Sequence, residues 1–280
     1  MGQHTLIRVY LAKVLAFFLR LALSLRYDVK VEGTEVLMGN RPHFLLPNHQ
    51  ALIDPVILLA HLYKHTTAIP VLTSDFYDMP FLKPFFSGWG AVRVSNLEGK
   101  SRNTNVLNEI SSAVVAGFSQ NRNILLYPGG QLAAQGFERI VNKKSAHLIV
   151  TNMPSDVRVI AIRISGLWGS IWSKAWTGKT PGFVWQLFRG MFYVWANFVF
   201  FMPRRKVSIH IEDVTLQAID RAQSGRPQFN GFLERFYNQH GEEPVLFLKH
   251  YFYGRKPRRT LPPNLKGAIP QHMAGSGMHV

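Results

Sequence analysis

Two spacings of apolar residues alternate along most of this 280-residue chain. Short apolar runs bounded by glycine, proline or polar residues predict buried strands. Longer segments whose apolar residues recur every three or four positions predict helices, and residues 103–118 show this spacing most clearly. The predicted strands are 27–32, 41–46, 68–72, 90–94, 123–127, 157–164 and 207–212, and the predicted helices between them are 55–63, 103–118 and 145–150.

This alternation predicts an α/β fold with a mostly parallel sheet flanked by helices. In such sheets, functional loops follow the carboxyl ends of strands. Two loops occupy that place in the sequence, residues 47–54 and the segment that begins at Pro128. We therefore look for the functional site in these two loops.

The N-terminal residues 5–25 are largely apolar, but Arg8, Lys13 and Arg20 interrupt them. The charge-free runs are too short for a membrane-spanning helix, and no small-residue cleavage site follows. Long basic side chains can lay their stems on apolar surface and keep their charged ends in water. The pattern predicts an amphipathic, membrane-associating helix over 1–26. The alternative is a helix packed on the protein's own core.

A second apolar stretch, 183–202, holds nine aromatic residues and a single charged residue, Arg189. The basic run Pro203-Arg204-Arg205-Lys206 follows it directly. A 20-residue apolar stretch with a basic flank can enter or cross a bilayer. The alternative is a core helix beside a substrate tunnel. We leave both interpretations open at this point.

The composition narrows the classes of function. Lys and Arg number 32 against 16 Asp and Glu, and 47% of residues are apolar. High apolar content excludes a disordered chain, whereas a net charge of +16 fits nucleic acid or an anionic membrane. We expect no nucleic-acid partner, because zinc-finger spacing and RNA-recognition signatures are missing while aromatic residues are frequent. The chain has no cysteine, and the pair His61 and His65 has no third ligand nearby in sequence, so we expect no metal.

The loop 47–55 contains the most reactive pair of residue types, His49 and Asp54. These residues are five apart, about 140° around an ideal helix, so only a turn can bring them together. Pro55 suits the first turn of a helix, and we expect Asp54 to be its N-cap. A carboxylate that holds one imidazole nitrogen leaves the other free to accept a proton from a hydroxyl. The simpler alternative is a capping aspartate with an unrelated loop histidine.

Residues 48–54, N-H-Q-A-L-I-D, resemble the N-H-x4-D motif of the glycerolipid (lysophospholipid) acyltransferase family. Residues 90–94 (GAVRV), 127–132 (YPGGQL) and 159–162 (VIAI) resemble the second, third and fourth blocks of that family, in the same order. The likeness covers roughly residues 25–250. Segments 203–210 and 236–244 resemble bacterial members related to the acyltransferase half of acyltransferase/acyl-ligase proteins.

The resemblance implies a membrane-associated O-acyltransferase that moves a fatty acyl chain from a thioester to the hydroxyl of a lysolipid. His49 would be the general base and Asp54 its partner, with acyl-CoA or acyl carrier protein as donor and no other cofactor. The implied organisation is an interfacial helix (1–26), an acyltransferase domain (27–250) and a basic, flexible tail (251–280). Membrane lipids are the implied partners, with acyl carrier protein if it is the donor, at the cytoplasmic face of the inner membrane.

The same resemblance suggests the residues that contact substrate, and the second and third blocks depart from the family pattern at three positions. Gly129 stands in place of Glu, Leu132 in place of Arg, and Asn96 in place of Arg. Cations of this kind bind phosphate monoesters strongly. We therefore expect an acceptor other than lysophosphatidic acid, with a larger head group or no phosphate. Arg93, Lys100 and Arg102 are either substitutes for the missing cations or solvated surface residues. The expected substrate-binding residues are Asn48, Arg93, Asn96, Pro128, Gly129, Gly130 and Gln131.

These departures also leave open a protein of another class, a non-catalytic acyl- or membrane-binding protein with the same fold.

Overall fold

The computed structural model describes residues 14, 16–79, 83, 86, 91–94 and 104–253. Its strands form one seven-stranded sheet in the order β1-β7-β6-β2-β5-β3-β4. Every neighbouring pair is parallel except β6 and β7, which are antiparallel. The strands are β1 (Tyr27–Glu32), β2 (His43–Pro47), β3 (Ala68–Thr73), β4 (Val92–Val94), β5 (Asn123–Leu125), β6 (Arg158–Ser165) and β7 (Arg205–Asp213). The predicted α/β fold with a mostly parallel sheet is confirmed.

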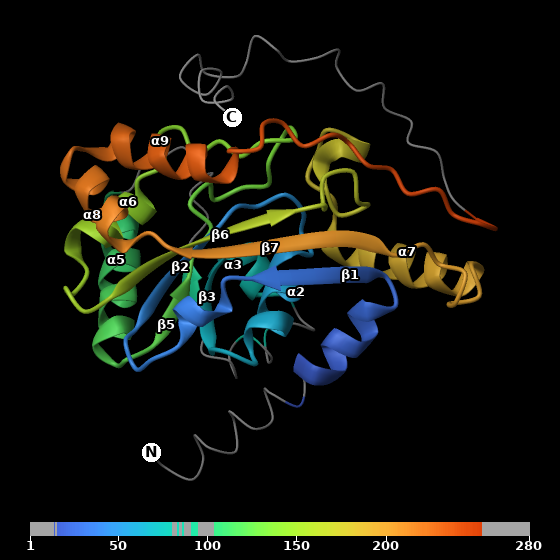
Figure 1. Cartoon of the computed structure of the whole chain (residues 1–280), viewed down its shortest axis with the longest axis horizontal. Helices are drawn as coiled ribbons and strands as arrows, with labels where there is room; N and C mark the ends of the chain where they lie inside the picture. Colours follow the sequence, from blue (N-terminus) through green and yellow to red (C-terminus); the bar gives the residue numbers. More distant parts are fainter. Residues whose placement is uncertain are drawn as a thin grey trace.

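Helices cover both faces of this sheet (Figure 1). One face packs against α5, α6, α8 and α9, and the other packs against α2 and residues of the N-terminal helical stretch 16–24. The helices are α2 (Asp54–Leu62), α3 (Ser74–Tyr77), α5 (Thr104–Ser119), α6 (Ser145–Asn152), α7 (Phe183–Ala196), α8 (Thr215–Gln223) and α9 (Arg226–Tyr237), with 3-10 turns η1 (Thr34–Leu37) and η2 (Lys174–Trp176).

The central strand β2 is buried on both faces. Phe44 and Leu46 pack on the side of α5 and α9, while Leu45 packs on the side of α2. Alternate side chains of a strand point to opposite faces, so a fully apolar strand requires cover on both. This burial fixes the position at which the chain leaves β2, in the middle of the sheet.

The two apolar stretches that could enter a membrane take different forms. Residues 16–24 are helical, while residues 1–13 and 15 lie outside the described part of the predicted helix 1–26. The stretch 183–202 does not form one long helix, because α7 ends at Ala196 after 14 residues. Such a helix is about 21 Å long, shorter than the roughly 30 Å of a hydrocarbon core. Within the described residues, no helix has both the length and the apolar character to cross a bilayer.

The predicted tail also falls largely outside the described residues, since only 251–253 of 251–280 are included. The chain between α9 and that point returns to the domain. Its Glu243 backbone N–H donates to Gly136 O, and its Leu246 backbone N–H donates to Trp168 O. Residues 238–250 therefore belong structurally to the domain that begins at β1.

Candidate active site

The loop after β2 begins with a residue that ties it to the neighbouring strand. Asn48 donates from Nδ2 to the carbonyl oxygen of Ile164 (2.9 Å), and its Oδ1 accepts the Ile164 backbone N–H (2.6 Å). The side chain of Asn48 thus continues the pairing of β2 with β6 by one residue. Both partners are buried backbone groups, so these contacts give Asn48 a structural role, and its predicted role in substrate binding stays a prediction.

The turn that follows brings His49 and Asp54 together. His49 Nδ1 lies 3.1 Å from Asp54 Oδ2. The same carboxylate oxygen accepts the backbone N–H groups of Gln50 (2.6 Å) and Ala51 (2.9 Å). Asp54 is fully buried, whereas 15% of the His49 side chain is exposed. The pairing excludes the simpler alternative of a capping aspartate with an unrelated histidine.

The expected N-cap role of Asp54 is wrong. The N-cap of α2 is Ile53, and Asp54 is the first residue of the helix, followed by Pro55. The Asp54 carboxylate points back to the amides of the preceding turn instead of to those of its own helix. It stabilises the turn that carries His49, which a carboxylate used as an ordinary cap would not do.

The charge of Asp54 is balanced by its neighbours. Burial raises the pKa of Asp54. The hydrogen bond from His49, the electrostatic interaction with His49 and the two backbone amides oppose that rise. Asp54 Oδ1 is buried and has no hydrogen-bond partner among the described residues. A buried carboxylate held in this way fixes the orientation of the imidazole and favours a proton on Nδ1.

The third sequence block lies against this pair. The Tyr127 ring packs on the His49 ring with a centroid distance of 4.2 Å, and Ala133 donates its backbone N–H to His49 O (2.7 Å). The turn between them places Gly130 at φ +61°, a left-handed conformation that favours glycine. Pro128 and Gly129 are buried, whereas Gly130 and Gln131 are exposed beside them.

Glu138 is part of this site, although no sequence pattern predicts it. Its Oε2 accepts the backbone N–H of His49 at 2.9 Å. Glu138 is buried, and this burial raises its pKa to about 8, with the charges of Asp54 and Glu234 adding to the rise. A Cβ atom on Gly129 would lie 2.4 Å from Glu138 Oε1. The departure from the family pattern at position 129 thus provides the space in which the Glu138 carboxyl lies.

A second acidic residue distant in sequence supports the other side of the turn. Gln50 donates from Nε2 to Glu243 Oε2, and its Oε1 accepts the Leu167 backbone N–H (3.2 Å). Glu243 Oε1 accepts the Gly166 backbone N–H (2.7 Å). The segment after β6 and the Glu243 side chain therefore hold Gln50 in place within this turn.

Of the remaining predicted substrate residues, only Arg93 belongs to the part of the chain that the structure describes. Arg93 on β4 is exposed and forms an ion pair with Asp78 (2.6 Å), which engages its guanidinium group. Leu132 is buried. Asn96, Lys100 and Arg102 lie outside the described residues. The expectation that Arg93 replaces the missing cations has no support from its contacts.

A large apolar cavity of about 750 Å³ begins beside the turn. Ile53 and Pro55, the two neighbours of Asp54, contribute to its wall. The cavity then extends between the N-terminal helical stretch, through Leu19 and Leu23, and α7. Its size and its walls of aliphatic and aromatic side chains suit a hydrocarbon chain.

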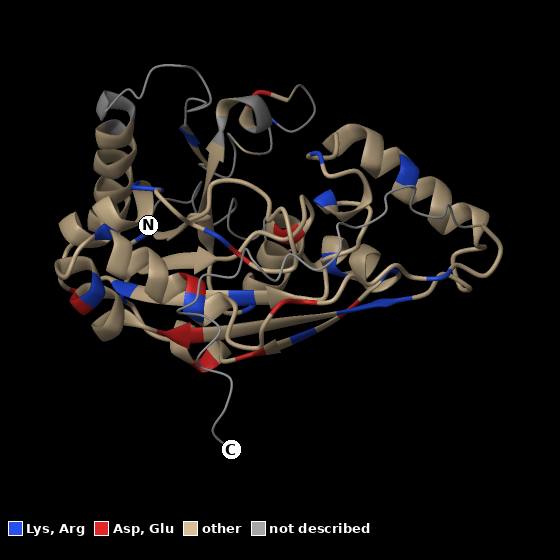
Figure 2. Cartoon of the chain, turned by 90° about the horizontal axis from the view of Figure 1, so that it is seen from above, with Lys and Arg blue, Asp and Glu red and all other residues tan. Residues whose placement is uncertain are grey.

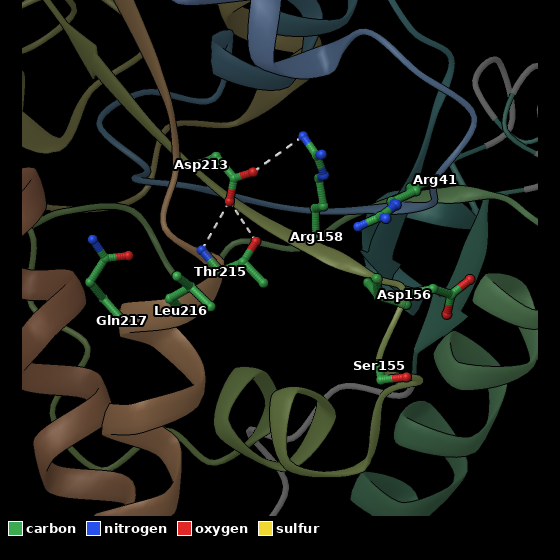
Figure 3. A pocket seen from close by; sticks show the side chains of 9 residues that line it. Arg41, Ser155, Asp156, Arg158, Asp213, Thr215, Leu216 and Gln217 are labelled. Atoms are coloured by element: carbon green, nitrogen blue, oxygen red, sulfur yellow. Dashed lines mark hydrogen bonds and ion pairs between the residues drawn. The ribbon is translucent and has the colours of Figure 1, made fainter.

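A smaller cavity of about 360 Å³ lies at the opposite end of β6, where that strand begins (Figure 3). Its Asp213 pairs with Arg158 (3.5 Å) and accepts hydrogen bonds from the backbone N–H and hydroxyl of Thr215. Arg158 and Ile164 are six residues apart on one strand, about 20 Å, so this cavity is separate from His49.

Comparison with known proteins agrees with this geometry. Residues 28–165 match the sequence family described as Acyltransferase. The fold is similar to the crystal structure of the 1-acyl-sn-glycerophosphate (LPA) acyltransferase PlsC from Thermotoga maritima, with a TM-score of 0.55 and 18% sequence identity over 86% of this chain and 82% of that one. The comparison with curated proteins finds no match. The matched region contains both His49 and Asp54.

Proposed function

Because the chain belongs to the lysophospholipid acyltransferase family, we propose that it is a lysolipid O-acyltransferase in which His49 is the general base and Asp54 orients it. The distance of 3.1 Å between His49 Nδ1 and Asp54 Oδ2 carries this proposal. With a proton on Nδ1, the Nε2 atom of His49 is the one that can accept a proton from an acceptor hydroxyl.

The chemistry needs no nucleophilic side chain and no cofactor. His49 Nε2 takes the proton of the lysolipid hydroxyl while that oxygen attacks the carbonyl carbon of the acyl thioester. The tetrahedral intermediate collapses by breaking the C–S bond, and the leaving thiolate receives the proton from His49. The ester forms with no net gain or loss of protons or electrons. A positioned base of this kind contributes typically about 10²–10⁴-fold in rate.

The apolar cavity supports a fatty acyl group as the part transferred or accepted. Its wall reaches Ile53 and Pro55, so a chain in the cavity would end close to the dyad. The donor is an acyl thioester, either acyl-CoA or acyl carrier protein. Gly130 and Gln131 are exposed at the turn beside His49, and this exposure supports a role for them in contacting the acceptor head group.

The acceptor that fits best is a lysolipid other than lysophosphatidic acid. The third block supplies no cation, since Leu132 is buried, and Arg93 is already paired with Asp78. At these two described positions, a phosphate monoester would find no free cation for the charge-assisted hydrogen bonds that make its binding strong. A diester head group or a phosphate-free lysolipid has less need of them.

The alternative, a non-catalytic acyl- or membrane-binding protein, draws on the same departures at 129 and 132. The dyad favours catalysis over that alternative, since a binding protein has no need of a buried carboxylate aligned on an imidazole. Both substrates carry long acyl chains, so we expect the enzyme to work as a peripheral or monotopic protein at the cytoplasmic face of the inner membrane.

Lipid profiling of cells tests the function and identifies the acceptor. The endogenous gene is deleted, and the cells are then supplied with either the wild-type chain or the His49→Ala variant. We expect one lysolipid class to accumulate with His49→Ala and its acylated product to fall. Identical profiles, with equal amounts of both proteins, would contradict the proposal, and a change in phosphatidic acid alone would contradict the assignment of the acceptor.

A further inference from the structure

Helix α7 has the reverse of the polarity that a surface helix of a water-soluble protein normally has. Its polar residues face the protein: Gln186 is buried, and Arg189 donates from Nε and Nη2 to the Tyr193 hydroxyl (2.9 and 2.8 Å). The Arg189 guanidinium also lies 4.9 Å from the centre of the Trp176 ring. The outward face is apolar, with Trp185 70% and Phe188 62% exposed.

This outward face is wide and continuous. At 100° per residue, the exposed apolar side chains of α7 cover an arc of about 160°, and Gln186, Arg189 and Tyr193 occupy the opposite side. Figure 2 shows blue but no red on this helix, which lies at one end of the molecule in Figure 1. The exposed residues on the arc are Val184, Trp185, Leu187, Phe188, Met191, Phe192 and Trp195.

Two further segments enlarge the same surface. Phe252 packs edge-on against Phe198 (5.4 Å) and Phe201 (5.6 Å), and Tyr253 packs against Phe192 (5.2 Å). Phe200, at the turn after α7, is 91% exposed. We call this surface the aromatic platform, and it consists of Val184, Trp185, Phe188, Phe192, Phe198, Phe200, Phe201, Tyr251, Phe252 and Tyr253.

The charged residues that lie close in sequence to the aromatic platform are basic, although Arg204 also lies 3.9 Å from Asp28 of β1. Between Asp156 and Glu212 the sequence has no acidic residue but eight basic ones, and after Glu243 it has six basic residues and no acidic one. Lys179, Arg204 and Lys249 are exposed close in sequence to the platform. Protein surfaces that combine aromatic side chains with flanking cations bind at the interface of an anionic bilayer.

The platform also borders the apolar cavity. Leu187, Met191 and Trp195 line that cavity from the same helix, whereas the platform residues of α7 do not. On the other side of the cavity, the N-terminal helical stretch exposes Phe17, Phe18 and Leu21. A bilayer in contact with both elements would be continuous with the cavity, so an acyl chain could enter without crossing water.

We infer that the aromatic platform is a second membrane-docking surface, which inserts into the headgroup layer of an anionic leaflet beside the cavity. This inference deepens the proposed function, because a lipid substrate is what gives the docking its purpose. Insertion is shallow, since α7 lies on the protein surface and is too short to span.

Vesicle sedimentation of the full chain tests the docking without any turnover. The test variant is the triple Trp185→Ser, Phe188→Ser, Phe192→Ser. The matched control, Met38→Ser with Leu216→Ser, removes two exposed apolar residues elsewhere, Leu216 being 80% exposed. With vesicles of phosphatidylcholine and phosphatidylglycerol, we expect the triple variant to bind roughly 10- to 100-fold more weakly and the control to bind as wild type.

Tryptophan quenching by brominated acyl chains gives an independent readout. We expect wild-type fluorescence to be quenched and Trp185→Phe to lose part of that quenching. Equal vesicle binding by the triple variant and wild type would overturn the docking surface, whatever the acyltransferase assay shows. Conversely, loss of vesicle binding by the triple variant with normal acyl transfer to lysolipid in detergent micelles would support the docking and the proposed function separately.

Discussion

Gly129 and Glu138 occupy adjoining space, because a Cβ atom at position 129 would lie only 2.4 Å from Glu138 Oε1. Real Cβ atoms do not approach oxygen so closely, so a side chain at 129 must displace the Glu138 carboxyl. That carboxyl also accepts the backbone N–H of His49. The glycine in the third block and the glutamate nine positions later therefore form a matched pair beside the dyad.

We expect Gly129→Ala to lower the free energy of unfolding by roughly 1–3 kcal/mol and to reduce kcat, because Glu138 must move away from His49. Adding Glu138→Ala should remove the clash, so the double variant is more stable than the sum of the single effects predicts. Urea unfolding of all four proteins measures this coupling. Gly190→Ala is the control, because its Cβ would make an ordinary 3.7 Å contact with Ile171.

Additive effects of Gly129→Ala and Glu138→Ala would contradict the pairing. The substitution Gly129→Glu gives a sharper comparison, since it restores the residue of the family pattern. We expect Gly129→Glu alone to be less active than Gly129→Glu combined with Glu138→Ala.

Glu138 also makes stability depend on pH. Burial raises its pKa from 4.5 to about 8, so the folded protein holds a proton on this carboxyl over a range in which the unfolded chain has lost it. Folding therefore takes up a proton between these values, and the free energy of unfolding should fall as pH rises through that window, by up to about 1.4 kcal/mol per pH unit.

Urea midpoints measured across the window for wild type and Glu138→Gln test this dependence. Glutamine has nearly the same shape and can accept the His49 N–H, but it does not titrate in this range. We expect the downward slope to be reduced in Glu138→Gln. Parallel slopes for the two proteins would show that Glu138 is ionised in the folded state.

The cavity beside α7 predicts how acyl-chain length is selected. Gly190 lines the cavity, and a Cβ there meets only Ile171 at 3.7 Å, so a larger side chain can enter the open space. We expect Gly190→Phe to shift the transferred acyl chains to shorter lengths and Gly190→Ala to behave as wild type. Mass spectrometry of the products formed from a mixture of acyl donors measures the distribution. An unchanged distribution in Gly190→Phe would place the acyl chain elsewhere.

Much of the fold follows from local sequence patterns. The strand predicted at 27–32 has the bounds of β1, and the apolar runs around 43–47 and 158–165 form the buried strands β2 and β6. These runs are readable because continuous apolar strands need cover on both faces. Helices α8 and α9 are missing from the predicted elements, although α9 buries Phe229, Leu233 and Phe236 at helical spacing.

The site was predictable only where its residues are close in sequence. His49 and Asp54 lie in one loop, and the family resemblance singled them out. Glu138 meets His49 across 89 residues, and Glu243 meets Gln50 across 193. Contacts over such separations depend on how the sheet is ordered, which apolar periodicity does not specify. By contrast, the placement of Gln186 and Arg189 on one side of an aromatic helix is visible in the sequence and could have indicated the reversed polarity of α7.

The measurement that tests the central claim most directly is acyl transfer by purified His49→Ala, with His65→Ala as the matched control. His65 is exposed in the turn after α2 and has no place in the site. Circular dichroism first checks that both variants are folded. We then predict that kcat/KM falls by about 10²-fold or more in His49→Ala and stays at the wild-type value in His65→Ala. Acyl transfer by His49→Ala at the wild-type rate would contradict the account.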